Sequence, residues 1–292
     1  MKILLVSDFH FHKPWFHWLT KTAPAYDLVC LAGDLLDAFN NDIGVGTQIV
    51  WLLKEWKPLY LRTGVPLAIS SGNHDFNSTA IQNNCFGYVE GEAELLDRIA
   101  NHHAWMELLA CDNSQNAAQI ITDQRNQILL MKDGTPIVIS TIPDNFYGDN
   151  KTSLTQQRLW KEAASIKRRL SNEHQKNVFW VVLNHQPPRN CKIESGFGCP
   201  LTTSRVQYLQ PDFVFCGHEH MAPYWPENSF MDKIGKSLCF NAGQCLHPNR
   251  IPTHPQPNHI VIDTAESSAT WKHYVPVISG YSSQTLPLDL SL

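Results

Sequence analysis

Short apolar runs recur along the chain, and each run ends in a cluster of polar residues. Continuous apolar stretches of this length are typical of strands that are buried on both faces of a sheet. They predict strands over 2–8, 27–34, 65–75, 135–144, 177–185 and 211–220. We expect three further strand-like segments to add to a second sheet, at 237–244, 258–264 and 269–275.

Helix-like segments lie between these strands, at 15–22, 46–62, 92–109, 153–172 and 202–209. The clearest begins at Ser153, a candidate N-cap, and apolar residues follow at 159, 163, 166 and 170. Alternation of strands with helices predicts an α/β fold in which helices cover sheets. We interpret 1–276 as a single domain and 277–292 as a C-terminal tail.

Composition narrows the class of protein. With 43% hydrophobic residues among 292, the chain can form a packed core, which excludes wholesale disorder. A net charge of −4 disfavours broad contact with duplex nucleic acid but leaves a single strand open. No apolar run approaches the roughly 20 residues of a membrane helix, and the N-terminus is too soon polar for a signal peptide. The eight cysteines contain no Cys-x-x-Cys and predict reduced thiols. We therefore expect a cytoplasmic protein without membrane association.

Acids, histidines and an amide follow five of the predicted strands. In chain order these groups are Asp8-x-His10, Asp34-x-x-Asp37, Asn73-His74-Asp75, Asn184-His185 and His218-Glu219-His220. In open α/β sheets, ligands bind outside the carboxyl ends of the strands. Five strand ends can therefore deliver these side chains to one crevice.

The polar set offers seven oxygen and nitrogen ligands and no thiolate. They are Asp8, His10, Asp34, Asn73, His185, His218 and His220. Seven ligands are too many for one tetrahedral ion, but they suit two divalent ions that share a carboxylate. Each motif alone has an ordinary explanation, since Gly-Asp is typical of turns and Asn-His-Asp can cap a helix. Their joint occurrence at strand ends favours a metal centre.

The motifs as a set resemble those of the calcineurin-like metallophosphoesterases. The matching stretches are Asp8-x-His10, Gly33-Asp34-x-x-Asp37, Gly72-Asn73-His74-Asp75, Asn184-His185 and Gly217-His218-x-His220, within about residues 1–245. The resemblance implies a four-layer α/β/β/α sandwich of two mixed sheets with a dinuclear centre. It implies that Asp8, His10 and His220 bind one ion. It also implies that Asn73, His185 and His218 bind the other ion, and that Asp34 bridges the two.

The same resemblance places His74 beside the substrate. A histidine next to a phosphate needs a fixed tautomer, which a carboxylate on its other ring nitrogen provides. In the family, an acid at the position of Asp37 commonly pairs with this histidine. We expect an Asp37–His74 pair in which His74 protonates the leaving oxygen or stabilises the transition state. Such a general acid contributes about 10²–10⁴ in rate.

The implied reaction is hydrolysis of phosphoester bonds. Two divalent ions (Mn, Fe, Zn or similar) would hold the phosphoryl oxygens, and a bridging hydroxide would attack phosphorus. Relatives that act on phosphoserine and phosphothreonine carry an arginine where this chain has Ala38, which counts against a protein phosphatase. Arg189 is a candidate substrate-binding residue, although a solvated loop arginine explains it equally well.

Three segments after ligand-bearing strands are candidate pocket walls, at 76–92, 186–201 and 244–257. Their aromatic and basic residues include Phe76, Phe86, Tyr88, Phe197, His247, Arg250 and His254. From the resemblance we interpret the protein as a phosphodiesterase or phosphatase for small phosphoesters. Nucleotide-like phosphoesters are included because aromatic rings can stack on nucleobases. A manganese-dependent nuclease acting on single strands and a non-catalytic metal-binding scaffold are the alternatives. The oligomeric state is open.

Overall fold

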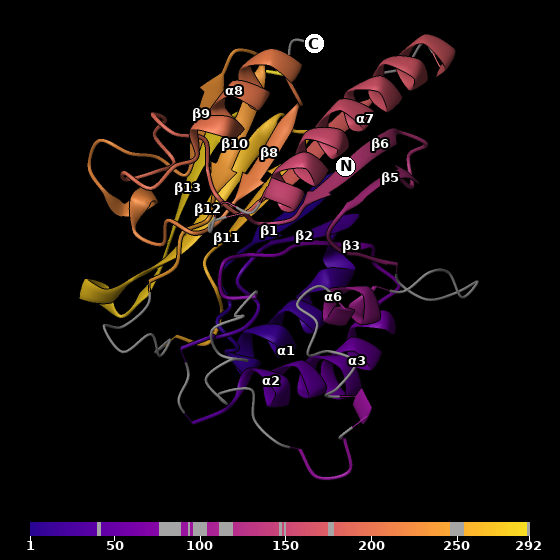
Figure 1. Ribbon diagram of the computed structural model, residues 1–292. Coiled ribbons are helices and arrows are strands. Elements are labelled where there is room, and N and C mark those ends of the chain that lie inside the picture. The colour runs from indigo at the N-terminus through magenta and orange to yellow at the C-terminus, as the bar shows by residue number, and fades with distance from the viewer. Residues whose placement is uncertain are drawn as a thin grey trace.

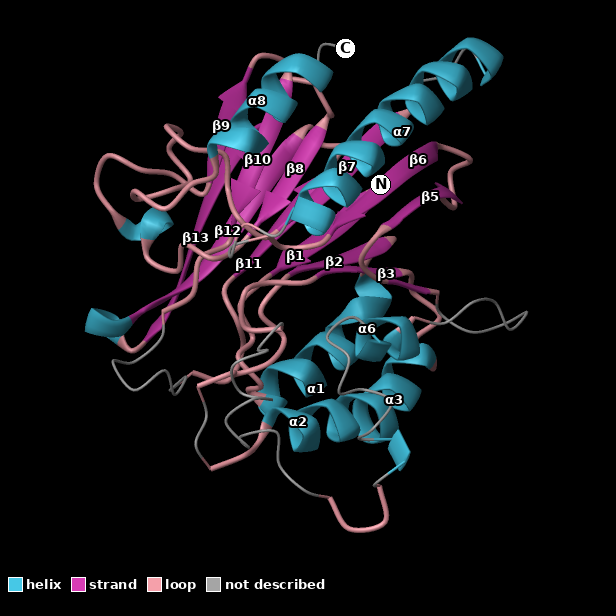
Figure 2. Cartoon of the chain, viewed as in Figure 1, coloured by secondary structure: helices cyan, strands magenta, loops and turns pink. Residues whose placement is uncertain are grey.

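Two mixed sheets pack face to face, and helices cover their outer faces (Figures 1 and 2). The structure is a computed structural model that describes 1–39, 42–75, 89–92, 94–95, 104–110, 119–145, 148, 150–174, 178–245 and 254–290. The expected α/β fold, a four-layer sandwich of two mixed sheets, is confirmed.

The first sheet has the order β13-β12-β11-β1-β2-β3-β4. Its strands are β1 (Lys2–Val6), β2 (Leu28–Ala32), β3 (Leu67–Ser70), β4 (Ile120–Ile121), β11 (His259–Asp263), β12 (Ser268–Val275) and β13 (Gly280–Pro287). β1 to β4 are parallel to one another, whereas β11 pairs antiparallel with β1. The carboxyl ends of β1, β2 and β3 therefore lie at one edge.

The second sheet has the order β5-β6-β7-β8-β10-β9. Its strands are β5 (Arg125–Leu130), β6 (Pro136–Ile142), β7 (Phe179–Asn184), β8 (Phe213–Cys216), β9 (Met231–Ile234) and β10 (Ser237–Asn241). β6, β7, β8 and β10 run parallel, and the two edge strands pair antiparallel with their neighbours.

Helices form the two outer layers (Figure 2). The first sheet is covered by α1 (Lys13–Thr22), α2 (Val45–Trp51), the π-helical turn η2 (Leu52–Trp56), α3 (Lys57–Leu61) and α6 (Ala104–Leu109). The second is covered by α7 (Asn150–His174) and α8 (Pro200–Leu209). Short 3₁₀ turns are η1 (Ala23–Ala25), η3 (Ala222–Tyr224) and η4 (Pro276–Ile278). Among the described residues, no helix is long and apolar enough to cross a membrane.

Alternate residues of the inner strands explain the layering. Ile3 and Leu5 of β1 face the core between the two sheets, where they join Val181 and Leu183 of β7. Leu4 faces the other way, toward the helices that cover the first sheet. Every position of β2 and β7 is buried because these inner strands have a hydrophobic layer on both sides.

The placement of the late strands differs from the expectation. Of the three segments expected in a second sheet, only β10 joins it, beside β8. β11 and β12 lie in the first sheet, where Ile262 of β11 is opposite Ile3 of β1. The segment 277–292, interpreted as a tail, contains β13, which pairs with β12 from Gly280 to Pro287. The long helix α7 begins at Asn150, so Ser153 lies inside its first turn.

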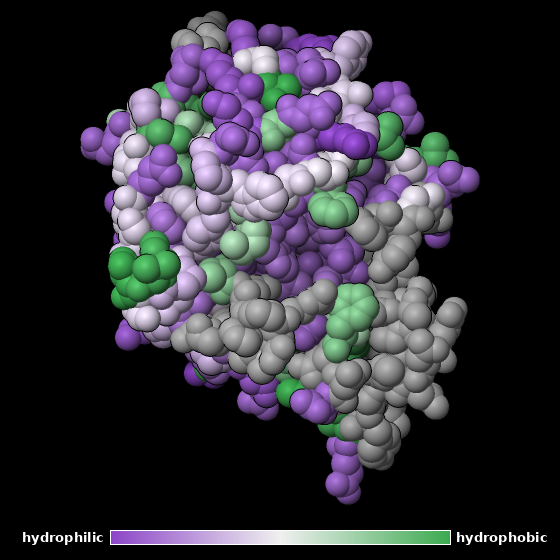
Figure 3. All heavy atoms as spheres, turned by 90° about the vertical axis from the view of Figure 1, so that its left-hand side faces the viewer, coloured by the Kyte–Doolittle hydropathy of each residue, from purple (hydrophilic) through white to green (hydrophobic). Residues whose placement is uncertain are grey.

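The surface view in Figure 3 shows a hollow on one face of the molecule. Hydrophilic residues lie in this hollow, and hydrophobic residues lie along part of its border.

The late strands are predicted to be essential for stability. Trp271 on β12 is 3% exposed, is stacked against Phe230 and donates its indole N–H to the carbonyl of Ala242 at 2.7 Å. Trp271→Ala should lower the free energy of unfolding by about 3–5 kcal/mol, because it leaves a cavity and an unpaired carbonyl. Urea denaturation measures this change. Trp225→Ala is the matched control, since Trp225 is 55% exposed. Equal, small effects of both substitutions would contradict the described packing.

Candidate metal centre

Backbone hydrogen bonds connect the loop after β1 to the loop after β2. Asp8 and His10 have φ of 57° and 42°, a region that residues other than glycine seldom adopt. Their N–H groups donate to the carbonyls of Gly33 and Asp34 at 3.0 and 2.9 Å. Unusual backbone held by such bonds is typical of functional sites. The side chains from two strand ends are thereby brought to one place.

Asp34 is the residue on which the loops converge. Its carboxylate is 2% exposed, and Oδ1 accepts the backbone N–H of His74 at 2.8 Å. The other oxygen, Oδ2, lies 3.3 Å from Nε2 of His185 and 3.8 Å from Nε2 of His10. One carboxylate therefore lies between histidines that come from different sheets.

The first predicted ligand set is brought together. The candidate ligand atoms of Asp8, His10, Asp34 and His220 all lie within 4.8 Å of one another. Nε2 of His220 is 3.1 Å from Nε2 of His10 and 3.2 Å from Oδ1 of Asp8. Oδ2 of Asp8 is buried and has no hydrogen-bond partner among the described residues. A buried carboxylate oxygen without a donor and two ring nitrogens that face each other fit a bound cation.

The second predicted set meets Asp34 through His185, whose Nε2 lies 3.3 Å from Oδ2 of Asp34. Oδ1 of Asn73 is 3.1 Å from Nε2 of His185 and 2.8 Å from Nδ1 of His218. The Nδ1–H of His185 donates to the carbonyl of Ala32 at 2.8 Å. This bond leaves the Nε2 lone pair of His185 available to a metal ion. An amide oxygen and two imidazoles also fit a divalent cation.

Glycines let the backbone approach the ligand side chains. A Cβ atom at Gly72 would lie 2.2 Å from Oδ1 of Asp34, and one at Gly217 would lie 2.7 Å from Oδ2 of Asp8. Both distances are far below van der Waals contact, so neither position accepts a side chain without displacing a carboxylate. Glycine is therefore required for steric reasons at both positions, each of which directly precedes a proposed ligand.

Burial and neighbouring charges shift the pKa values of the acids and histidines in the site. Burial disfavours the ionised form of Asp34, but the charges of His185 and His74 outweigh it and hold its pKa well below the usual value. Burial lowers the pKa of His218 to about 4 and that of His10 well below its usual value. The pKa of His185 moves the other way: burial lowers it, but the charge of Asp34 and the contact with its carboxylate outweigh burial and hold the pKa well above the usual value. A cation bound at Asp34 would replace that proton, because an imidazole ligates a metal in its neutral form.

The predicted Asp37–His74 pair also meets in the structure. Nδ1 of His74 lies 3.8 Å from Oδ1 of Asp37, a distance of an ion pair rather than of a hydrogen bond. The ring of His74 is 4.5 Å from the ring of His10, centroid to centroid. Ligand atoms of His10, Asp37 and His74 lie within 4.8 Å of one another, so this group could also contact a cation.

Two buried polar side chains outside the predicted ligand set hold these loops. Gln48 of α2 accepts the N–H of Asp37 at 2.8 Å and donates to its carbonyl at 2.9 Å. Asp75 accepts the N–H groups of Leu36 and Gly72 at 2.9 and 2.8 Å. Asp75 follows Asn73-His74 and so had a positional signal. Nothing in the sequence distinguishes Gln48 from an exposed helix residue.

The candidate substrate contacts are less closely connected to the centre. Arg189 is exposed, and within the described part of the chain its guanidinium makes no hydrogen bond or ion pair. His254 is buried, and its ring nitrogens lie 2.7 and 3.0 Å from the carbonyls of Gln256 and Cys245, so it is not a pocket wall. The other proposed wall residues Phe76, Phe86, Tyr88, His247 and Arg250 lie outside the described residues.

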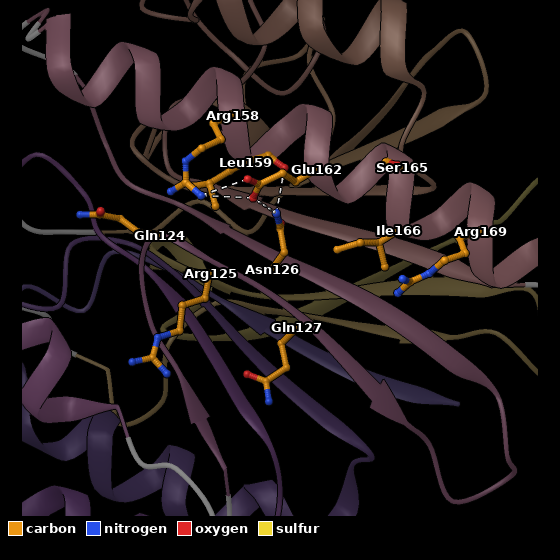
Figure 4. A pocket seen from close by; sticks show the side chains of 10 residues that line it. All are labelled: Gln124, Arg125, Asn126, Gln127, Arg158, Leu159, Glu162, Ser165, Ile166 and Arg169. Atoms are coloured by element: carbon orange, nitrogen blue, oxygen red, sulfur yellow. Dashed lines mark hydrogen bonds and ion pairs between the residues drawn. The ribbon is translucent and has the colours of Figure 1, made fainter.

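A separate groove of about 650 Å³ lies between β5 and α7 (Figure 4). Arg158 on α7 is paired there with Glu162, at 3.1 Å, and Arg125 extends from β5 away from the helix. Elsewhere on α7, Lys167 of the basic run 167–169 is paired with Asp212 at 2.6 Å. Arg158 and Lys167 are therefore partly neutralised by acids.

Comparisons with known proteins agree with this geometry. Residues 1–222 match the family model of the calcineurin-like phosphoesterases. A search among curated proteins finds no match. The solved structure of GAP50, the anchor in the inner membrane complex of Plasmodium, is similar in fold, with a TM-score of 0.53 and 9% identity over 99% of this chain and 89% of that one. The calcineurin-like phosphoesterase YfkN from Bacillus subtilis has a TM-score of 0.44 and 10% identity over 98% and 90% of the two chains. Because the family model covers most of its length, the chain belongs to the calcineurin-like phosphoesterase family and is a hydrolase of phosphoester bonds.

Proposed function

We propose that the protein is a phosphodiesterase or phosphomonoesterase with a dinuclear metal centre and a small, nucleotide-like substrate. One ion is held by Asp8, His10 and His220. The other is held by Asn73, His185 and His218, and Asp34 is shared. The observation that carries the proposal is the position of Asp34 Oδ2, 3.8 Å from His10 Nε2 and 3.3 Å from His185 Nε2.

The remaining chemistry is assigned to side chains of the chain. Bound divalent ions would neutralise phosphate charge and supply a nucleophile from water at neutral pH. Asp37, 3.8 Å from Nδ1 of His74, stabilises the imidazolium form of His74. His74 then gives a proton to the leaving oxygen. Gln48 holds the Asp37 backbone in place and so positions this pair.

The choice of a small substrate rests on charge. A substrate with a long phosphate backbone requires a continuous basic surface. The net charge is −4, and Lys167 and Arg158 on α7 are each paired with an acid. Ala38 offers no phosphate clamp of the kind that would suit a phosphoprotein. Arg189 is exposed on the loop after β7 and remains our candidate for contact with the substrate phosphate.

Loss of the shared carboxylate should abolish both metal retention and hydrolysis. Purified protein should contain about two ions per chain, and a chelator should stop hydrolysis of bis-p-nitrophenyl phosphate until manganese is added. Asp34→Asn should lower kcat by more than about 100-fold and reduce the metal content measured by mass spectrometry. Asp133→Asn, at an exposed acid, is the control and should change neither. Full activity of Asp34→Asn would overturn the dinuclear assignment.

A general-acid role for His74 predicts dependence on the leaving group. His74→Asn should lower kcat by about 10²–10⁴ for alkyl phosphoesters, because their alkoxides need a proton to depart. The loss should be much smaller for p-nitrophenyl esters, whose leaving group is stable without a proton. Asp37→Asn should show the same trend more weakly. Metal content should stay unchanged in both variants; a loss of metal would instead assign His74 and Asp37 as ligands.

A further inference from the structure

One exposed aromatic ring is held against the proposed general acid. Phe39 is 59% exposed, and its ring lies edge-to-face on His74 with centroids 4.9 Å apart. Its backbone N–H donates to Oδ1 of Asp37 at 3.2 Å. The ring therefore lies beside the two residues that we place at the leaving oxygen, and more than half of the residue's surface is exposed.

A second exposed ring is tied to the ligand segment after β8. Phe197 is 68% exposed, and its N–H donates to Oε1 of Glu219 at 2.8 Å. The other carboxylate oxygen of Glu219 accepts the hydroxyl of Ser195. Glu219 is buried and lies between His218 and His220 in the chain. The backbone of Phe197 is thus held to the segment that carries two of the proposed metal ligands.

The loop that carries Phe197 is also held by hydrogen bonds among its own residues. The carboxylate of Glu194 accepts the N–H groups of Asn190, Gly196 and Gly198 at 3.0, 2.6 and 3.0 Å. Exposure of a large apolar ring is unfavourable, and an ordered loop could have turned it inward. Exposed aromatic rings on well-held loops are typical of binding sites.

We propose, on the basis of the function proposed above, that the substrate is a phosphoester whose leaving group carries a flat aromatic ring. Phe39 packs against that ring while His74 protonates the ester oxygen. Phe197 contacts the second ester group when the substrate is a diester. Phe39 is thus a specificity-determining residue, and packing of two aromatic rings increases discrimination by about tenfold.

The test compares alcohols of similar acidity that differ only in the ring. The metal-loaded, full-length protein is assayed with benzyl and butyl phosphoesters, and with a cyclohexylmethyl ester as a bulky ring that is not flat. Esters of a nucleoside form a further arm that separates a nucleobase from a simple aryl group. We expect kcat/KM to favour benzyl over butyl by about tenfold, mainly through KM.

Phe39→Ala should lower the benzyl-to-butyl ratio to about one, whereas Phe39→Tyr should retain it. Tyr208→Ala on α8, a position that is 86% exposed and belongs to none of the proposed ligand groups, is the matched control and should keep the ratio. An equal loss for both esters in Phe39→Ala would show that the ring only supports His74 and would overturn the proposal. A cyclohexylmethyl ester that matches benzyl would also overturn it.

A binding measurement tests the aromatic site independently of the proposed phosphoesterase activity. Benzylphosphonate and butylphosphonate are titrated calorimetrically into the metal-loaded protein, which requires no turnover. Tighter binding of benzylphosphonate that depends on Phe39 supports the aromatic site even if no ester is hydrolysed. Hydrolysis of butyl esters without any preference for the ring in rate or binding would leave the phosphoesterase intact and refute the aromatic site.

Discussion

The buried carboxylate of Asp34 is the constraint on which the site depends. A charge that is 2% exposed is unfavourable unless donors surround it. Those donors come from the loops after β3 and β7, through the backbone of His74 and the ring of His185, while the ring of His10 from the loop after β1 lies 3.8 Å away. Because few waters screen these contacts, each is stronger than it would be on the surface. Satisfying this one carboxylate therefore brings together the residues of the candidate metal centre.

The two sheets supply the centre jointly. Asp8 and Asn73 follow strands of the first sheet, while His185 and His218 follow strands of the second. The apolar core between the sheets fixes their separation, and a packed core resists deformation. Histidines from one sheet can then face carboxylates from the other at about 3 Å. A site built across two rigid layers keeps its ligand spacing better than a site built within one flexible loop.

In the proposed enzyme, buried ligands and exposed aromatic rings have different roles. The candidate metal ligands are held by backbone bonds and by glycines that admit no side chain, as at Gly72 and Gly217. Phe39 and Phe197 are connected to the same loops but face solvent. Reaction type therefore follows from the interior of the site, whereas the choice of substrate follows from residues at its border.

The sequence by itself determined the approximate positions of the inner strands, the α/β class and the polar residues that follow β1, β2, β3, β7 and β8, although the predicted strands extend past the observed carboxyl ends. These features are local, because a strand buried on both faces must be apolar throughout and can become polar only where it ends. Only the tertiary structure decided that β11 and β12 join the first sheet and that β13 extends it. It also decided that Gln48 holds Asp37 and that Phe39 lies on His74. Such choices depend on which distant surfaces pack together, and the same alternation of apolar and polar residues fits many partners.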